Sequence, residues 1–99
     1  MYSVKQPLVK SPVSIVRAGI NWTQFLESGD TVATSTWSCD SDDITFSRQQ
    51  LVGNTASCRI AGGIAGNSYE VFNTITTTSG DVDRRYFVVE IEDTQLSIE

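Results

Sequence analysis

Two segments near the end of the chain alternate between residues expected to face the core and residues expected to face solvent. This pattern constrains the fold more than any other feature. The second of these segments places Phe87, Val89 and Ile91 on one face. Alternation with a period of two is typical of half-buried β-strands, and residues 79–81, Ser-Gly-Asp, predict a hairpin connection between them. The first segment places every second residue on one face: Tyr69, Val71, Asn73, Ile75 and Thr77.

Shorter segments with the same alternation precede this hairpin. We expect strands near residues 13–17, 31–37, 44–46 and 55–60, because these are rich in β-branched or alternating apolar residues. A glycine-rich run at residues 62–67 predicts a turn with positive φ. About seven short strands separated by turns are typical of a β-sandwich, so we predict an all-β fold. The expected inward residues are Ala33, Ser35 and Trp37, then Ile44 and Phe46, then Ala56, Cys58 and Ile60.

One segment departs from the strand pattern and predicts a short helix. Asn21 is a favoured N-cap residue, and Trp22, Phe25 and Leu26 follow it at helical spacing. Gly29 is placed to end the helix. We therefore expect one or two helical turns over residues 22–28, held mainly by the packing of two aromatic rings on the core.

The charge of the chain is divided unevenly along its length. The net charge of −5 combines a segment of +3 at residues 1–17, which holds Lys5, Lys10 and Arg17 and no acidic residue, with −8 at residues 18–99. Both prolines lie in the basic segment and disfavour helix there. We predict an extended arm over residues 1–17, a sandwich over residues 18–92 and a tail over residues 93–99. The arm would either lie on an acidic surface or remain a solvated tail.

Composition argues against most catalytic and metal-binding chemistry. Histidine, the commonest general base and metal ligand, is absent. Asp40, Asp42 and Asp43 resemble the start of a calcium loop, but the positions that need glycine and glutamate hold Thr45 and Leu51. We therefore predict no enzyme, no metal site and no cofactor.

Several other classes of partner are also disfavoured. The acidic body argues against nucleic-acid binding, which needs phosphate neutralisation. No apolar run is long enough to span a membrane, and the amino terminus lacks the apolar region of a signal peptide. Cys39 and Cys58 are expected to be free thiols, with Cys58 buried.

An outward-facing apolar strip is the remaining candidate for function. On strand alternation, Phe72, Tyr86 and Val88 point away from the inward faces of the two paired strands. Such a patch needs a cover, which either residues 1–17 of the same chain or a partner protein would supply. The candidate interface therefore consists of this strip with three basic residues: Lys5, Lys10, Arg17, Phe72, Tyr86 and Val88.

Two blocks of the sequence resemble the phage fibre–tail adaptor proteins, a family of small structural proteins of tailed phages. The first block is residues 19–32, GINWTQFLESGDTV, continued by Ser35-Thr36-Trp37, with Phe25 where the family usually has tryptophan. The second is residues 62–77, GGIAGNSYEVFNTITT, and Lys10-Ser11-Pro12 resembles a Lys-Asp-Pro element. The resemblance extends over residues 10–91, with the expected residues of its last part at Gly80, Asp83, Arg85, Phe87 and Val89.

This resemblance implies an immunoglobulin-like virion protein that is assembled in the host cytoplasm. It would be present in several copies in a symmetric ring and would join tail or neck components, a portal-proximal ring or fibres. Two alternatives remain open at this point. One is a capsid decoration protein, which copy number per particle would distinguish. The other is a carbohydrate-binding module that uses Trp22, Trp37 or Tyr86 as a stacking platform, which requires an exposed ring.

Overall fold

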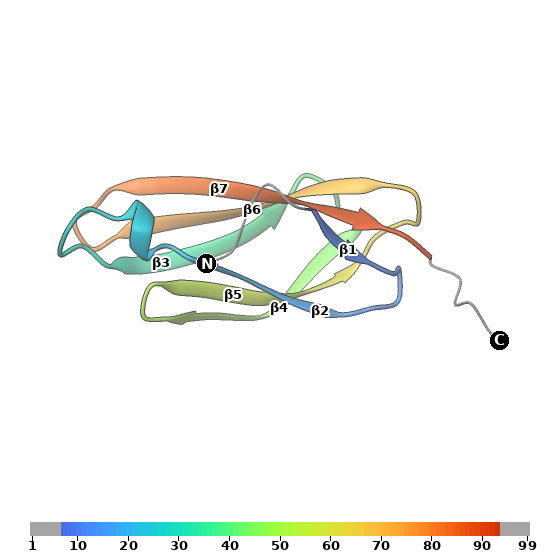
Figure 1. Ribbon diagram of the computed structural model, residues 1–99, viewed down its shortest axis with the longest axis horizontal. Coiled ribbons are helices and arrows are strands. Elements are labelled where there is room, and N and C mark those ends of the chain that lie inside the picture. Colours follow the sequence, from blue (N-terminus) through green and yellow to red (C-terminus); the bar gives the residue numbers. More distant parts are fainter. Residues whose placement is uncertain (1–6, 94–99) are drawn as a thin grey trace.

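Seven strands form two sheets that lie face to face (Figure 1). The structure is a computed structural model that describes residues 7–93. Within them a single 3-10 turn, η1, interrupts the all-β order. The elements are β1 Leu8–Lys10, β2 Val16–Asn21, η1 Thr23–Phe25, β3 Val32–Cys39, β4 Ile44–Val52, β5 Thr55–Gly62, β6 Ser68–Thr77 and β7 Val82–Ile91.

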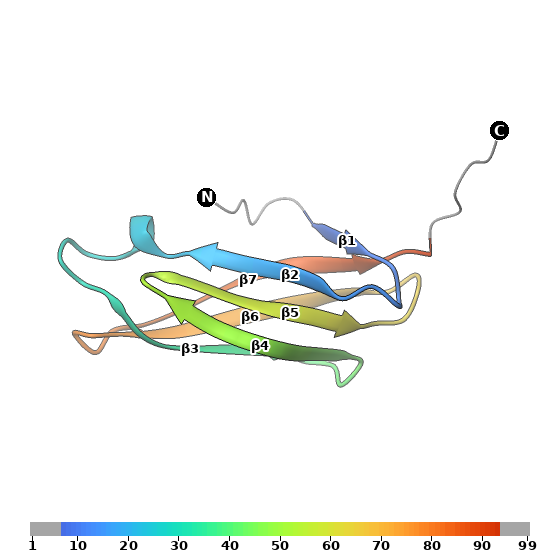
Figure 2. The same cartoon turned by 90° about the horizontal axis from the view of Figure 1, so that it is seen from below.

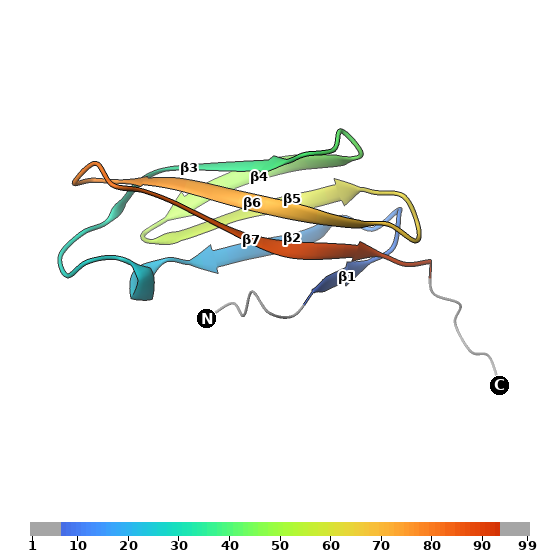
Figure 3. The same cartoon turned by 90° about the horizontal axis from the view of Figure 1, so that it is seen from above.

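The strand order is that of an immunoglobulin-like sandwich. One sheet has the order β1-β7-β6-β3 and the other has the order β2-β5-β4. The groups β7-β6-β3 and β2-β5-β4 correspond to the two facing groups of strands in the immunoglobulin fold, and the short β1 pairs in parallel with the last strand. Figure 2 shows the three-stranded sheet towards the viewer, and Figure 3 shows the four-stranded sheet. The predicted fold class is therefore confirmed.

The core lies between the two inner faces, as the alternation predicts. In the β6–β7 hairpin, Phe72 faces Tyr86 and Val71 faces Phe87, so each strand presents one buried and one outer set of side chains. All five predicted inward residues of β6 are buried, as are the three of β7. The largest fully buried side chains come from both sheets and include Trp22, Ile60, Val71, Ile75, Phe87, Val89 and Ile91.

A buried hydrogen-bond network connects the two layers. Trp22 follows β2, and its Nε1 donates to Asn73 Oδ1 on β6 at 2.8 Å. Asn73 Nδ2 donates to Ser35 Oγ on β3 at 2.9 Å and to the Thr36 carbonyl at 3.2 Å. The polar atoms of this fully buried amide are therefore satisfied, as burial of an amide requires.

The helical segment is shorter than the sequence predicts. Only residues 23–25 form helix, and it is a 3-10 turn. The Asn21 side-chain oxygen accepts from the Thr23 amide at 3.0 Å, while the Trp22 amide donates to the Asn54 carbonyl at 2.9 Å. Leu26 is already extended, so the segment ends after one turn. Such a short helix has little stability of its own, and the pairing of Trp22 with residue 54 fixes its start.

The inward face of β3 also differs from the prediction. Ala33 is exposed, and Val32 is buried in its place. The register shifts between Val32 and Thr34, so a bulge reverses the alternation at that point. Ser35 and Trp37, which follow the bulge, face inward as predicted.

Two short parts of the expected arm belong to strands of the sandwich. Residues 8–10 form β1 at the edge of the four-stranded sheet, and residues 16 and 17 begin β2 in the three-stranded sheet. These residues belong to strands because their backbone groups pair with β7 and β5. Residues 1–6, and residues 94–99 of the predicted tail, lie outside the described part of the chain.

Candidate interaction surface

The predicted apolar strip is formed on the outer face of the four-stranded sheet. The rings of Phe72 and Tyr86 lie in register on β6 and β7, with their centroids 5.6 Å apart. Tyr86 is 48% exposed, and Val88 lies two residues further along the same face. On β1, Val9 is 50% exposed and is paired with outward-facing Glu90. We call Val9, Phe72, Tyr86 and Val88 the apolar strip.

A cation lies against one end of this strip. The guanidinium carbon of Arg84 is 4.5 Å from the centroid of the Phe72 ring. This geometry is a cation–π contact, which orders the arginine above the ring and leaves its charge near the strip. The strip therefore offers an aromatic pair with one cation at its end.

The described part of residues 1–17 does not cover the strip. β1 extends the four-stranded sheet sideways, beside β7, and β2 lies in the other layer (Figure 3). The sequence left two possible covers for the strip, residues 1–17 of the same chain or a partner protein. Residues 7–17 of the same chain are therefore excluded as the cover. Val9 was missed because the sequence places it in an arm, and only its pairing with β7 brings it to this face.

The two predicted basic residues that the structure describes, Lys10 and Arg17, do not lie on this surface. Lys10 is only 4% exposed, and its Nζ donates to the carbonyl oxygens of Ser11 at 2.7 Å and Gly62 at 2.6 Å. Burial lowers the pKa of the Lys10 ammonium from its ordinary value. Arg17 is exposed on the outer face of the three-stranded sheet, and Lys5 lies outside the described residues.

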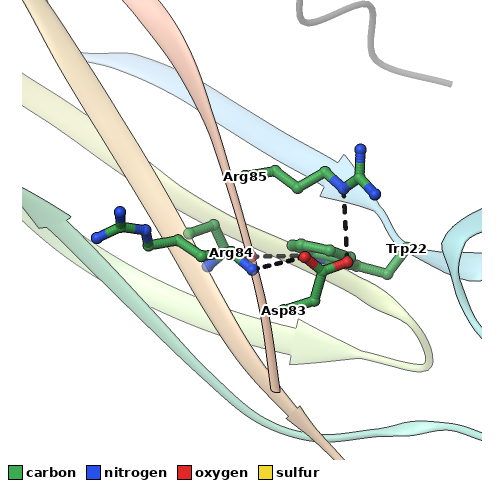
Figure 4. Close-up of polar contacts among 5 residues, drawn as sticks. Trp22, Asp83, Arg84 and Arg85 are labelled. Carbon is green, nitrogen blue, oxygen red and sulfur yellow. Dashed lines mark hydrogen bonds and ion pairs between the residues drawn. The ribbon is translucent and has the colours of Figure 1, made fainter. Parts of the chain in front are cut away.

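The amino-terminal end of β7 is organised by a second arginine (Figure 4). Arg85 Nε lies 3.5 Å from Asp83 Oδ2, and Asp83 Oδ1 accepts from the Arg84 amide at 2.8 Å. The Arg85 guanidinium lies 4.1 Å from the centroid of Phe25, whose ring packs edge-on against Trp22. The ion pair is about two-fifths exposed and contributes roughly 0–1 kcal/mol, so Arg85 acts mainly by covering Phe25.

A carboxylate joins two loops at the same end of the sandwich. Asp30 Oδ2 accepts from Ser79 Oγ at 2.6 Å, and Asp30 Oδ1 accepts from the Thr31 amide at 2.9 Å. The hydrogen bond from Ser79 is the main cause that holds the pKa of Asp30 below its ordinary value. This side chain therefore links the β2–β3 connection to the β6–β7 turn.

The acidic turn between β3 and β4 has a structural role for one of its members. Asp43 Oδ2 accepts from the Tyr69 hydroxyl at 2.9 Å, and the Asp43 amide donates to Ser41 Oγ at 3.1 Å. Asp40 and Asp42 are exposed. Within residues 7–93 there is no group of three or more side chains placed to bind a metal ion.

The two indoles are unsuited to stacking on a sugar. Trp22 and Trp37 are both buried in the core. Of the three rings considered for a carbohydrate platform, only Tyr86 reaches the surface.

A search of the described residues for membrane-spanning helices finds none of the required length and hydropathy.

These features define an immunoglobulin-like sandwich with a partly exposed apolar strip on the outer face of its four-stranded sheet. The family model described as podophage GP4 fiber-tail adaptor protein gp77 matches residues 10–90. The chain belongs to this family, which confirms the resemblance found in the sequence. A search of the curated proteins finds no match.

Proposed function

We propose that this chain is a structural adaptor of a phage particle and attaches to a neighbouring virion protein through the apolar strip. Membership of the fiber-tail adaptor family supports a place in the virion. The observation that carries the proposal is the aromatic pair of half-buried Phe72 and exposed Tyr86, on an outer sheet face that residues 7–17 leave open.

The strip has the chemistry of a contact between proteins. Aromatic side chains give large contact area with few rotatable bonds, and tyrosine adds a hydroxyl that can bond at the edge of an interface. Arg84, held above Phe72, supplies a cation beside the apolar centre. A modest contact of this size becomes strong attachment when several copies act together around a symmetric tail or neck.

The alternative of a capsid decoration protein relies on the same physics and differs in location. The matching family favours the tail, and the number of copies per purified particle distinguishes the two. The tail adaptor predicts a small ring of copies, whereas decoration predicts copies over the whole capsid lattice. In either case the partner is another virion protein, and assembly takes place in the host cytoplasm.

Incorporation into particles tests the role of the strip. Phage lacking the gene would be complemented with the wild-type chain, with Tyr86→Ser, or with Val52→Ser as the matched control. Val52 is 71% exposed near the β4–β5 turn, away from the strip. We expect purified particles to lack the Tyr86→Ser chain and to contain the Val52→Ser chain at the wild-type level.

Circular dichroism and thermal unfolding of each purified variant would show that the fold is retained. Normal incorporation of a folded double variant, Phe72→Ser with Tyr86→Ser, would refute the proposal that the strip is the attachment surface. Lys5 stays a predicted contact. Deletion of residues 2–6, which keeps β1 complete, should reduce incorporation if this segment reaches a partner.

A further inference from the structure

The three-stranded sheet carries a positive charge that the acidic composition of the chain conceals. β2, β5 and β4 contain three arginines, Arg17, Arg59 and Arg48, and no acidic residue. The chain as a whole has a net charge of −5. These three positive charges therefore belong to one sheet, which is towards the viewer in Figure 2.

The pairing of the strands brings the three arginines together. Arg17 on β2 lies directly opposite Arg59 on β5, and Arg59 lies opposite Ser47, the residue before Arg48 on β4. Neighbouring strands are about 4.8 Å apart, so three guanidinium groups share a small area. Like charges directly opposite one another destabilise a sheet. The fold alone gives no reason for this arrangement.

The backbone at Arg48 is also unusual. The register of β4 shifts between Ser47 and Gln50, and Arg48 has a φ of 48°. Within residues 7–93 it is the only residue other than glycine with positive φ. A left-handed conformation is unfavourable for a long side chain, and bulges of this kind redirect side chains next to functional sites.

A hollow of about 90 Å³ lies among these residues. Its lining includes the three arginines together with Gln50 and Ser57, which face each other across β4 and β5. Gly19, opposite Ser57 on β2, has no side chain to fill the space. Within the described residues the one ion pair is that of Arg85 with Asp83 on the other sheet, so the three arginines have no carboxylate partner there.

We infer that this arginine pocket binds the acidic β3–β4 turn of a second copy of the chain. Guanidinium groups bind carboxylates through paired, charge-assisted hydrogen bonds, and Gln50 and Ser57 add neutral donors. Asp40 and Asp42 are exposed at the end of the sandwich, on a turn that Asp43 anchors to Tyr69.

Charge complementarity selects this occupant over a nucleic acid. A long polyanion would also meet the acidic loops at both ends of the sandwich, whereas a short acidic turn meets only the pocket. The turn and the pocket are different surfaces of the molecule. Their contact is therefore heterologous, and repetition of a heterologous contact produces a ring when the rotation closes.

Sedimentation equilibrium of the full purified chain tests this contact without phage particles. We expect concentration-dependent association at low salt that weakens as salt is raised. Arg59→Asp and Asp42→Arg should each weaken association by at least about tenfold. An equal mixture of the two variants should associate again, because the unchanged turn of the Arg59→Asp chain can bind the unchanged pocket of the Asp42→Arg chain. Glu27→Arg, the same charge change as Asp42→Arg on an exposed residue at the other end of β3, is the matched control.

Three outcomes would overturn the inference. They are a monomeric wild-type chain at every concentration, an equal loss with the Glu27→Arg control, and a mixture that fails to restore association. Thermal unfolding of each variant would show that the changes act on a folded chain. Since the assay uses neither particles nor the apolar strip, its failure is separate from failure of the proposed attachment through Tyr86.

Discussion

The two buried tryptophans provide a direct test of how the sheets are held together. Trp22 and Trp37 are 0% and 5% exposed, and each packs against a phenylalanine ring. The two tryptophans differ in whether the indole nitrogen has a hydrogen-bond partner. Trp22 Nε1 donates to Asn73 Oδ1 at 2.8 Å, whereas Trp37 Nε1 is buried and has no hydrogen-bond partner in the described part of the chain. We predict that Trp22→Phe destabilises the fold more than Trp37→Phe.

The magnitude follows from what each change leaves behind. Both substitutions remove the same atoms from a buried site, so the transfer and cavity contributions largely cancel in the comparison. Trp22→Phe also leaves Asn73 Oδ1 buried without its donor, which costs about 1–3 kcal/mol. Trp37→Phe removes a donor that is already unpaired and leaves no acceptor behind. We expect the free energy of unfolding to differ between the variants by about 1–3 kcal/mol.

Urea unfolding followed by far-UV circular dichroism measures this difference without relying on tryptophan fluorescence. In a domain of this size each 1 kcal/mol corresponds to about 4–8 °C in Tm, so thermal unfolding gives a second reading. Equal destabilisation of the two variants, or a greater loss with Trp37→Phe, would refute the reasoning. Similar urea dependences of the free energy would show that the unfolded states are comparable.

Three further predictions concern single positions. Burial raises the pKa of Cys58 to about 12, so iodoacetamide should label Cys39 alone until denaturant is added; native labelling of both thiols would contradict this. Gly62→Ala should destabilise the fold by more than about 1–2 kcal/mol, because the backbone is left-handed there and the added Cβ would collide with a backbone oxygen. Urea unfolding measures this loss, with Gly80→Ala, whose Cβ would meet no atom, as the control. Because the pKa of Asp30 is lowered in the folded state, its carboxylate stabilises the fold at pH values above the unfolded pKa, and this stabilisation is lost as pH falls through the folded pKa. Asp30→Asn should therefore reduce the fall in the free energy of unfolding at acid pH. An unchanged fall would disprove the prediction.

Local alternation was sufficient to predict the β6–β7 hairpin and its outer strip. Phe72 and Tyr86 could be assigned to one face because a short turn connects their strands, which fixes the register between them. The alternation failed at Ala33, where a bulge shifts the register. It failed in the helical segment because the length of a single turn depends on tertiary partners, here the pairing of Trp22 with Asn54. In both cases the partner is distant in sequence: β3 pairs with β6 at the bulge, and Trp22 pairs with Asn54.

The distribution of charge shows why the candidate site could be predicted only in part. Proximity in sequence places Lys10 with Arg17 in one basic arm, but the fold buries Lys10 against the Gly62 carbonyl and turns Arg17 outward on the other sheet. Arg17 gains Arg48 and Arg59 as neighbours only through the pairing of β2 with β5 and of β5 with β4. β2 is distant in the chain from β4 and β5, and no turn fixes the register between β2 and β5. A basic surface assembled across three such strands can be located only once the sheet order is known, which is why the pocket was not predicted from the sequence while the strip was.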